Sequence, residues 1–463
     1  MQQGHPIKDT GRAGDRPSDP LRWLLKVEPG EGGRLAWSCG YFFCLLGGYY
    51  ILRPFRDEMG AAGGVDNLKW LYLGTLGSMM VASFLFAGLT TRFPRGRFIP
   101  FVYRFFAINL LIFFALLKLM PAAGQVHLGR VIFVWTSVYN LFVVSVFWSF
   151  MADVFTNPQG KRLFGFIAMG GTLGHICGSY VAEHYAQELG AVNLLLITVV
   201  LLEAACFCVG RLNAIARRRA EVGGVAAVPR SPDSSGPPAG DGDRGDRPIE
   251  GGPFAGLGLV LRSPYLLGIA LFMLFYTVTS TFLYITRLEV GLLWSDDPDA
   301  RVAFYARINL WTGVLTMLGQ IFLTSRLMGR LGVGLTLGIL PAITFVGFAI
   351  LGTSFVRPEL LATVWVLMLF ETIRRAGNFA FSRPAREVLY TVVGRQEKYK
   401  AKNLIDTFVY RAGDQVGVWA HAGLSIFLGA AAIAFAVVPL AAVWFALALA
   451  LGGRQRSLAA GNR

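Results

Sequence analysis

Charged side chains are scarce in this sequence, because Asp, Glu, Lys and Arg make up only 15% of its 463 residues. A typical soluble domain carries about 25%. Apolar residues make up 54%, and they gather into runs of roughly 20 residues, the length that an α-helix needs to cross a bilayer. The scarcity of charge therefore excludes an ordinary soluble protein. The apolar runs predict a multi-pass protein in a lipid bilayer.

Cysteine and histidine are also rare, with five of each. All five cysteines fall within apolar runs, which is typical of small buried side chains and not of a disulfide framework or a metal site. The histidines lack metal-ligand spacing, and we find neither a phosphate-binding GxxxxGK(S/T) loop nor a serine or cysteine triad pattern. We therefore expect no enzyme activity, no metal and no cofactor. Any transport would then draw on a gradient or on exchange.

The apolar runs predict an all-α membrane protein with 12 transmembrane helices in two six-helix halves. The first half comprises 34–54, 67–90, 98–120, 128–153, 162–186 and 191–211, and the second comprises 264–286, 302–326, 331–352, 358–381, 402–424 and 427–451. The interval between them is rich in Gly, Pro, Ser and Asp, which predicts a flexible linker. The predicted organisation is a polar N-terminal tail (1–33), a first half (34–211), a linker (212–262), a second half (263–451) and a C-terminal tail (452–463).

The net charge of +15 does not indicate a nucleic-acid partner, because the basic residues gather in alternate loops. One set of loops is basic, with residues such as Arg95 and Arg217, whereas the opposite set carries acids such as Asp66 and Asp297. The positive-inside rule places the basic loops, the linker and both termini in the cytoplasm. We see no cleaved signal peptide, and we expect a monomer in the inner membrane of a bacterium.

Short repeats support the division into halves. "LTTR" at 89–92 ends the second run and "LTSR" at 323–326 ends the eighth, while "GKRL" at 160–163 and "AKNL" at 401–404 open the fifth and eleventh. Matches at the same place in each half indicate a duplicated six-helix unit. This is the arrangement of major facilitator transporters, in which a substrate cavity at the midplane opens alternately to either side of the membrane.

Ionisable residues inside the predicted spans mark candidate sites, because an ion in hydrocarbon costs at least about 2.5–3.5 kcal/mol and therefore pairs or lines a cavity. The stretch "YYILRPFRDEMG" at 49–60 places Arg53, Arg56 and Asp57 on one helical face. For Arg53, either a cavity role or an internal ion pair explains its depth. Asp57 and Glu58 either belong to such a site or are solvated at the helix end.

Other predicted spans also carry ionisable residues. Glu203 is either a coupling carboxylate or the partner of an arginine on another helix. The eleventh span, "NLIDTFVYRAGDQVG", places Asp406, Arg411 and Asp414 within an arc of about 140°, a polar stripe that needs water or a polar ligand beside it. Asp406 and Arg411 lie on different sides of that helix, so we expect Asp406 to pair with a residue of the other half. Further charged positions are Arg104, Arg307, Glu371, Arg374 and Arg375.

Three stretches carry specific motifs. They are the 49–60 segment, "FWSFMADVFTNPQGKRLFGFIAMGGTLG" at 147–174, and the segments "FSRPAREVLY" and "KYKAKNLIDTFVYRAGDQVG" within 381–417. These stretches resemble the first-helix, fourth-to-fifth-helix and tenth-to-eleventh-helix segments of the non-mitochondrial ATP/ADP carrier family, nucleotide transporters within the major facilitator group. The resemblance implies a transporter fold and a nucleotide as the exchanged anion.

The resemblance also implies roles for individual residues. Arg56 occupies the place of a family lysine that serves nucleotide transport, Asp153 falls at a functional carboxylate, and Arg411 matches a family arginine. Two positions depart from the family pattern: Asp414 stands where the family places a lysine, and 279–281 lack the functional glutamate that the family carries nearby. A site that gains an anion in place of a cation binds a polyphosphate less well, by up to several kcal/mol in a partly buried position.

The predicted function is secondary active transport of a small anionic solute by alternating access, with nucleotide exchange as the leading substrate class. We assign substrate binding to Arg53, Arg56, Arg411 and Asp414. Gating or coupling is assigned to Asp57, Asp153, Lys161, Arg162, Glu203 and Asp406. Two alternatives stay open. One is proton-coupled transport of a different metabolite or drug, with Glu203 or Asp414 as the proton carrier; the other is a membrane assembly or sensor protein that does not transport.

Overall fold

The computed structural model describes residues 28, 31–92, 95–222, 255–356 and 360–461. Every regular element within these ranges is helical, as predicted. Most of the predicted N-terminal tail, and residues 223–254 of the predicted linker, lie outside the described residues.

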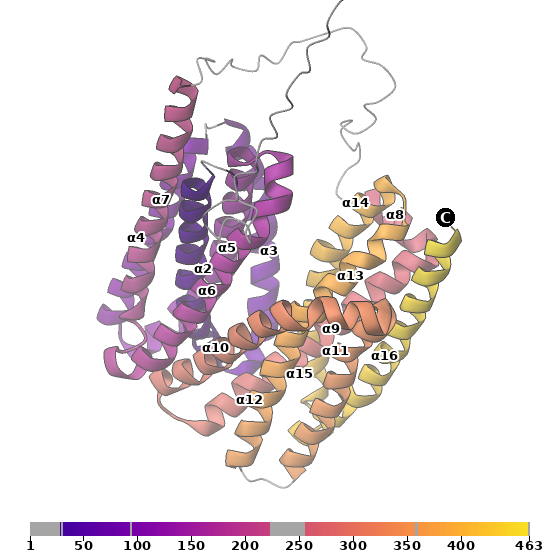
Figure 1. Ribbon diagram of the computed structural model, residues 1–463. Coiled ribbons are helices and arrows are strands. Elements are labelled where there is room, and N and C mark those ends of the chain that lie inside the picture. Colours follow the sequence, from indigo (N-terminus) through magenta and orange to yellow (C-terminus); the bar gives the residue numbers. More distant parts are fainter. Residues whose placement is uncertain (1–27, 29–30, 93–94, 223–254, 357–359, 462–463) are drawn as a thin grey trace, which may run out of the picture.

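The helices before the linker form the first helix group (Figure 1). Its elements are α2 (Gly32–Ala62), the short η1 (Val65–Asn67), α3 (Leu68–Arg92), α4 (Arg95–Leu119), α5 (Ala122–Val154), α6 (Asn157–Leu189) and α7 (Leu194–Val222). The central helix is α2, which packs against α5, α6 and α7.

The helices after the linker form the second helix group (Figure 1). Its longer elements are α8 (Ala255–Arg262), α9 (Pro264–Trp294), α10 (Pro298–Phe322), α11 (Thr324–Val356), α12 (Leu360–Gly377), α14 (Arg395–Leu404), α15 (Tyr410–Leu424) and α16 (Ala430–Gly461). Its shorter elements are η2 (Asn378–Ser382), α13 (Arg383–Leu389), η3 (Tyr390–Val392) and η4 (Ile405–Val409). The π-helical turns η2 and η4 interrupt the tenth and eleventh predicted spans, and such turns are often found at functional sites.

Each of the twelve predicted spans coincides with one of these helices or with a run of them. Eight of the described helices are long and apolar enough to cross a membrane. Two of the helices below that threshold are α6 and α10, which pack against each other between the two groups. Polar residues lower the mean hydropathy of both helices, and some of them, such as Glu183 and Arg307, form contacts between the two groups. The twelve-span topology stays a prediction.

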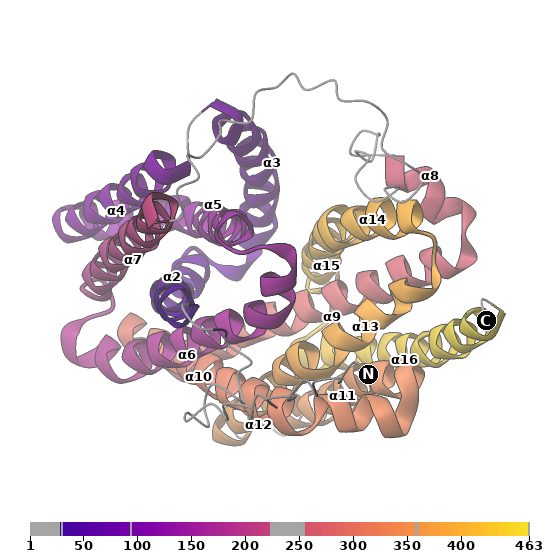
Figure 2. The ribbon, with the colours of Figure 1, turned by 45° about the horizontal axis from the view of Figure 1, so that its top comes forward.

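The two helix groups meet through α10 against α6 and α2, α15 against α3, and α9 against α2 (Figure 2). We call the end of the bundle where α7 ends and α8 begins the linker end, and the opposite end the η1 end. A shared apolar core joins Leu68 and Phe133 of the first group to Phe282 and Val418 of the second. The polar contacts between groups, described below, also lie from the middle of the bundle towards the η1 end.

Glycine allows α2 and α6 to approach closely. Gly170, Gly174 and Gly178 recur every fourth residue along α6, so they share one face of that helix. A Cβ atom at Gly174 would collide with the backbone of Phe43 on α2, and one at Gly178 with the backbone of Gly47. A backbone cannot move aside as a flexible side chain can, so this contact fixes the position of α2 and of the charged residues near its end.

We predict that Gly174→Val lowers the melting temperature of the purified protein in detergent, because overpacking a close helix contact costs about 1–3 kcal/mol or more. The matched control is Gly165→Val on the same helix, where an added Cβ meets no atom within 4 Å. Thermal unfolding followed by circular dichroism measures both. Equal melting temperatures for the two variants would contradict the α2–α6 contact.

Candidate functional site

The residues predicted from the 49–60 segment lie near the end of α2, on the side that faces the second helix group. Asp57 accepts a hydrogen bond of 3.0 Å from the Tyr284 hydroxyl and one of 2.7 Å from Arg287 Nη2. The side chains of Asp57 and Arg287 are fully buried, with 0% of each exposed. Asp57 is therefore not solvated at a helix end. The structure supports the other interpretation, in which this carboxylate belongs to an internal site.

Arg287 links this carboxylate to a second one. Its Nη1 donates to Glu371 Oε1 of α12 at 3.2 Å, so one guanidinium joins Asp57 and Glu371. Glu371 Oε1 also lies 3.5 Å from Arg375 Nη1, one turn further along α12. Buried ions are tolerated when each has a partner of opposite charge. The chain from Asp57 through Arg287 to Glu371 thus connects α2, α9 and α12.

A second buried ion pair lies one residue further along α2. Arg301 of α10 donates to the two carboxylate oxygens of Glu58 at 2.5 and 2.8 Å. It also donates to the Ser295 carbonyl oxygen at 2.7 Å. This two-bond geometry is the strong form of an arginine–carboxylate contact. The solvated interpretation of Glu58 is therefore wrong as well, since only 1% of its side chain is exposed.

Arg53 and Arg56 make fewer hydrogen bonds than Arg287 and Arg301 of the second group. Arg56 lies 3.9 Å from Asp57 Oδ1, a long contact, and its guanidinium lies over the Phe133 ring at 4.1 Å from the centroid. Arg53 lies over the Tyr50 ring at 5.7 Å. Among the described residues, the Nε atoms of both arginines are buried without a hydrogen-bond partner. Two guanidinium groups between the helix groups therefore have unused donors.

The polar stripe of the eleventh span is divided by the structure. Arg411 and Asp414, both on α15, contact each other at 3.4 Å. Asp406 lies in η4 and pairs with Arg386 of α13 at 3.5 Å. The expectation that Asp406 pairs with the other half is therefore wrong, because η4 and α13 both belong to the second helix group. The π-helical turn changes the helical phase on which that expectation rested.

The remaining predicted gating residues lie away from this centre. Glu203 contacts Arg104 at 3.3 Å between α7 and α4, with 47% and 61% of the two side chains exposed. This favours the ion-pair interpretation of Glu203. Arg162 at the start of α6 binds Glu28 and Glu31 at 2.6 and 2.8 Å, and Asp153 is exposed near the end of α5. The Lys161 side chain lies outside the described residues.

Arg287 is a central residue that is missing from the residues predicted above. It lies on α9 directly after the predicted span 264–286, and an arginine that follows a long apolar run is the signal that could have identified it. Glu371 and Arg375 were noted as charged positions without a role. The sequence alone does not give the register of α2, α9 and α12 relative to one another. That register brings Asp57, Arg287 and Glu371 together.

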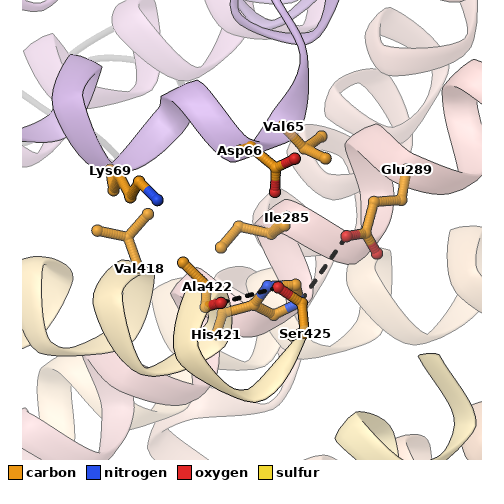
Figure 3. A pocket seen from close by; sticks show the side chains of 9 residues that line it. All are labelled: Val65, Asp66, Lys69, Ile285, Glu289, Val418, His421, Ala422 and Ser425. Atoms are coloured by element: carbon orange, nitrogen blue, oxygen red, sulfur yellow. Dashed lines mark hydrogen bonds and ion pairs between the residues drawn. The ribbon is translucent and has the colours of Figure 1, made fainter. Parts of the chain in front are cut away.

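A small cavity of about 30 Å³ lies between the groups at the η1 end, which is room for about one water molecule. Figure 3 shows Asp66 and Lys69 of the first group facing Glu289 and His421 of the second. His421 Nε2 lies 4.0 Å from Glu289 Oε1. The described residues contain no group of three or more His, Cys, Asp and Glu side chains that could hold a metal ion. This cavity is too small for an organic solute. Its polar lining residues come from both helix groups, so it is a polar part of the contact between them.

Part of the sequence is similar to the sequences of known carriers. The chain is 25% identical over 214 residues to ADP,ATP carrier protein 1 of Chlamydia muridarum, which covers 42% of this chain and 40% of that protein. It is 28% identical over 209 residues to ADP,ATP carrier protein 2 of Chlamydia trachomatis, covering 42% and 38%. The chain thus spans about 40% of the length of the curated relatives that it matches. These relatives are carriers and not enzymes. No family model matches the sequence.

Solved structures of transporters share the fold over almost the whole chain. The POT family transporter PepTSo aligns with a TM-score of 0.60 at 14% identity, over 92% of this chain and 98% of its own. The D-xylose–proton symporter aligns with a TM-score of 0.60 at 11% identity, over 91% and 97%, and the nucleoside transporter NupG with 0.55 at 13%, over 90% and 98%. The chain therefore has the same all-helical fold as these solved transporters, and its buried charges lie within that fold.

We predict that Asp57→Asn lowers the stability of the protein by about 3–5 kcal/mol, because it removes one of the two carboxylates that compensate the buried Arg287. Glu203→Gln is the control, since its half-exposed ion pair is expected to contribute about 0–1 kcal/mol. Melting temperatures in detergent compare the two. A loss for Glu203→Gln as large as that for Asp57→Asn would contradict the distinction between buried and exposed pairs.

Proposed function

We propose that this chain is a secondary active transporter that moves an anionic solute by alternating access between two six-helix halves. The observation that carries the proposal is the position of Arg53 and Arg56, which lie between the two helix groups with unused guanidinium donors. Transporters of this fold bind solutes near the midplane, between their two halves. Buried cations without full compensation at that place are suited to attract an anion.

Nucleotide is the substrate class that we propose for this site. The support comes from the names of the Chlamydia relatives, which are ADP,ATP carriers, and from the resemblance of the 49–60 segment to the first helix of that family. Arginine suits this role because its planar guanidinium can donate two parallel hydrogen bonds to a phosphate group. Asp414 opposes tight binding, and its contact with Arg411 at 3.4 Å shows how its charge is partly compensated.

The proposed orientation places the linker end in the cytoplasm, following the positive-inside rule. The η1 end then faces outward, and the pairs Asp57–Arg287 and Glu58–Arg301 hold it closed. Opening towards the outside requires both pairs to separate. At the linker end we assign gating or coupling to Asp153, Lys161 and Arg162, which lie at the junction of α5 and α6.

We predict that Arg56→Glu abolishes nucleotide uptake. The substitution reverses one charge beside Asp57, so repulsion of a polyphosphate replaces attraction, and we expect at least a tenfold loss, about 1.4 kcal/mol or more. The assay is uptake of labelled ADP into proteoliposomes preloaded with unlabelled ADP. Arg104→Gln, in the exposed pair with Glu203, is the control and should transport normally. Uptake by Arg56→Glu at the wild-type rate would exclude the nucleotide assignment.

We predict that Asp414→Lys strengthens ADP binding by about tenfold or more, because it replaces an anion beside the site with a cation. The measurement is the ADP dissociation constant from thermal stabilisation at two pH values, together with uptake. The proton-coupled alternative predicts the opposite outcome. If Asp414 carries the proton, both Asp414→Lys and Asp414→Asn lose the pH dependence of uptake, and ADP binding does not improve.

A further inference from the structure

Buried polar atoms without a hydrogen-bond partner gather where α2, α9, α10 and α12 meet. Within the described residues, these atoms include one guanidinium nitrogen each of Arg53, Arg56, Arg287 and Arg375, one carboxylate oxygen of Glu371, and both side-chain amide atoms of Asn309. An unbonded buried polar atom costs about 1–3 kcal/mol, and more when it is charged. A buried polar group without a partner in a native structure calls for an explanation, and a bound ion is one of them.

Two adjacent arginines on α12 show the contrast. Arg374 donates to hydroxyl groups of Thr344, Ser280 and Thr279 at 2.9, 2.9 and 2.7 Å. These partners belong to the second helix group, so Arg374 holds α12 against α9 and α11. Arg375, by contrast, has only the 3.5 Å contact with Glu371, and its Nη2 is buried without a partner.

Arg375 approaches Arg53 of the first helix group. Its partner Glu371 binds Arg287, and Arg287 binds Asp57, which lies one turn beyond Arg53 on α2. His175 of α6 is held in place, because its ring stacks on Tyr50 at 3.4 Å and its Nε2 lies 3.0 Å from the Asn309 carbonyl oxygen. Arg53 lies over the same Tyr50 ring. Arg53 therefore lies beside a rigid Tyr50–His175 stack of the first helix group, and the buried ion pairs bring Arg375 towards it from the second group.

The local balance of charge is positive. Four guanidinium groups, those of Arg53, Arg56, Arg287 and Arg375, are compensated by the two carboxylates of Asp57 and Glu371. Arg411 and Asp414 compensate each other. At least two positive charges are thus left over in a buried region, and the neighbouring Arg374 adds another that is bonded only to neutral oxygens. Like charges at short range repel strongly where water is excluded. An anion with two negative charges offsets the charges of Arg53 and Arg375.

We propose that Arg53 and Arg375 together bind one doubly charged oxyanion, a phosphate or a dicarboxylate, and so bridge the two helix groups. This inference rests on the proposed function and identifies the charge of the solute group and its partner in the second helix group. The bound group takes up the free donors of both arginines. It also competes with Glu371 for Arg375, which couples anion binding to the chain from Asp57 through Arg287.

The test uses the full-length protein, purified in detergent, with inorganic phosphate, ADP and succinate as probes. Dissociation constants are measured by thermal stabilisation for the wild type, Arg53→Gln, Arg375→Gln and the double variant. We expect each single variant to bind its anion at least tenfold more weakly. The double variant should bind about as weakly as either single one, because both arginines hold the same group. Arg307→Gln, in the partly exposed pair with Glu183, is the control and should bind as the wild type does.

The unliganded proteins give an independent readout. Arg375→Gln should raise the melting temperature without anion, because it removes a buried charge that is only weakly compensated. Arg374→Gln should lower it, because Arg374 makes four hydrogen bonds to α9 and α11. Arg375→Lys keeps the charge but loses the planar fork, so it should restore anion binding only in part. A merely structural role for Arg375 predicts a lower melting temperature for Arg375→Gln.

The outcomes separate the two proposals. Binding of phosphate and ADP through both arginines identifies a phosphate group, and binding of succinate alone identifies a dicarboxylate. Either result supports the proposal that Arg53 and Arg375 bind one anion together. If Arg53→Gln and Arg375→Gln both bind anions with wild-type affinity and Arg56→Gln does not, then Arg53 and Arg375 do not share an anion. That result leaves the proposed anion transport intact. Absence of binding and of uptake for every anion in the wild type overturns the proposed function itself.

Discussion

The structure depends on one constraint: an arginine buried in an apolar helical bundle needs an anion beside it. Asp57 and Glu58, at the end of α2, meet this need for Arg287 and Arg301 of the second helix group. Because each pair has one member in either group, compensating the charges also fastens the groups together. The closed contact at the η1 end is therefore a consequence of charge compensation as much as of apolar packing around Phe133 and Phe282.

The same constraint explains why the centre is suited to a ligand. Arg287 is compensated twice, by Asp57 and Glu371. Arg375 has only a 3.5 Å contact with Glu371 among the described residues, and the Nε atom of Arg53 is buried without a hydrogen-bond partner there. In the proposed mechanism, a solute anion at this place substitutes for a missing carboxylate and alters which guanidinium Glu371 contacts. Binding and the closure of the η1 end are then parts of one electrostatic network. In the proposed alternating-access transporter, this network is the physical means by which the protein senses its solute.

Much of the fold could be predicted, because apolar run length alone locates helices such as α9 and α16. The candidate site could be predicted only in part. Arg53, Arg56 and Asp57 stand out because they interrupt an apolar run, yet the partner of Asp57 depends on the register of α9 against α2, which no local pattern encodes. Asp406 shows the limit most clearly: its helical phase is shifted by the π-turn η4, and its partner Arg386 is in the same group.

The measurement that tests the central claim most directly is anomalous X-ray diffraction from crystals of the protein soaked in selenate, a divalent oxyanion that reports its own position. The account predicts a selenium peak between the two helix groups, at a position from which selenate oxygens lie within hydrogen-bond distance of the guanidinium groups of Arg53 and Arg375. A crystal structure with no peak there, in which both arginines are instead paired with protein carboxylates, would contradict it.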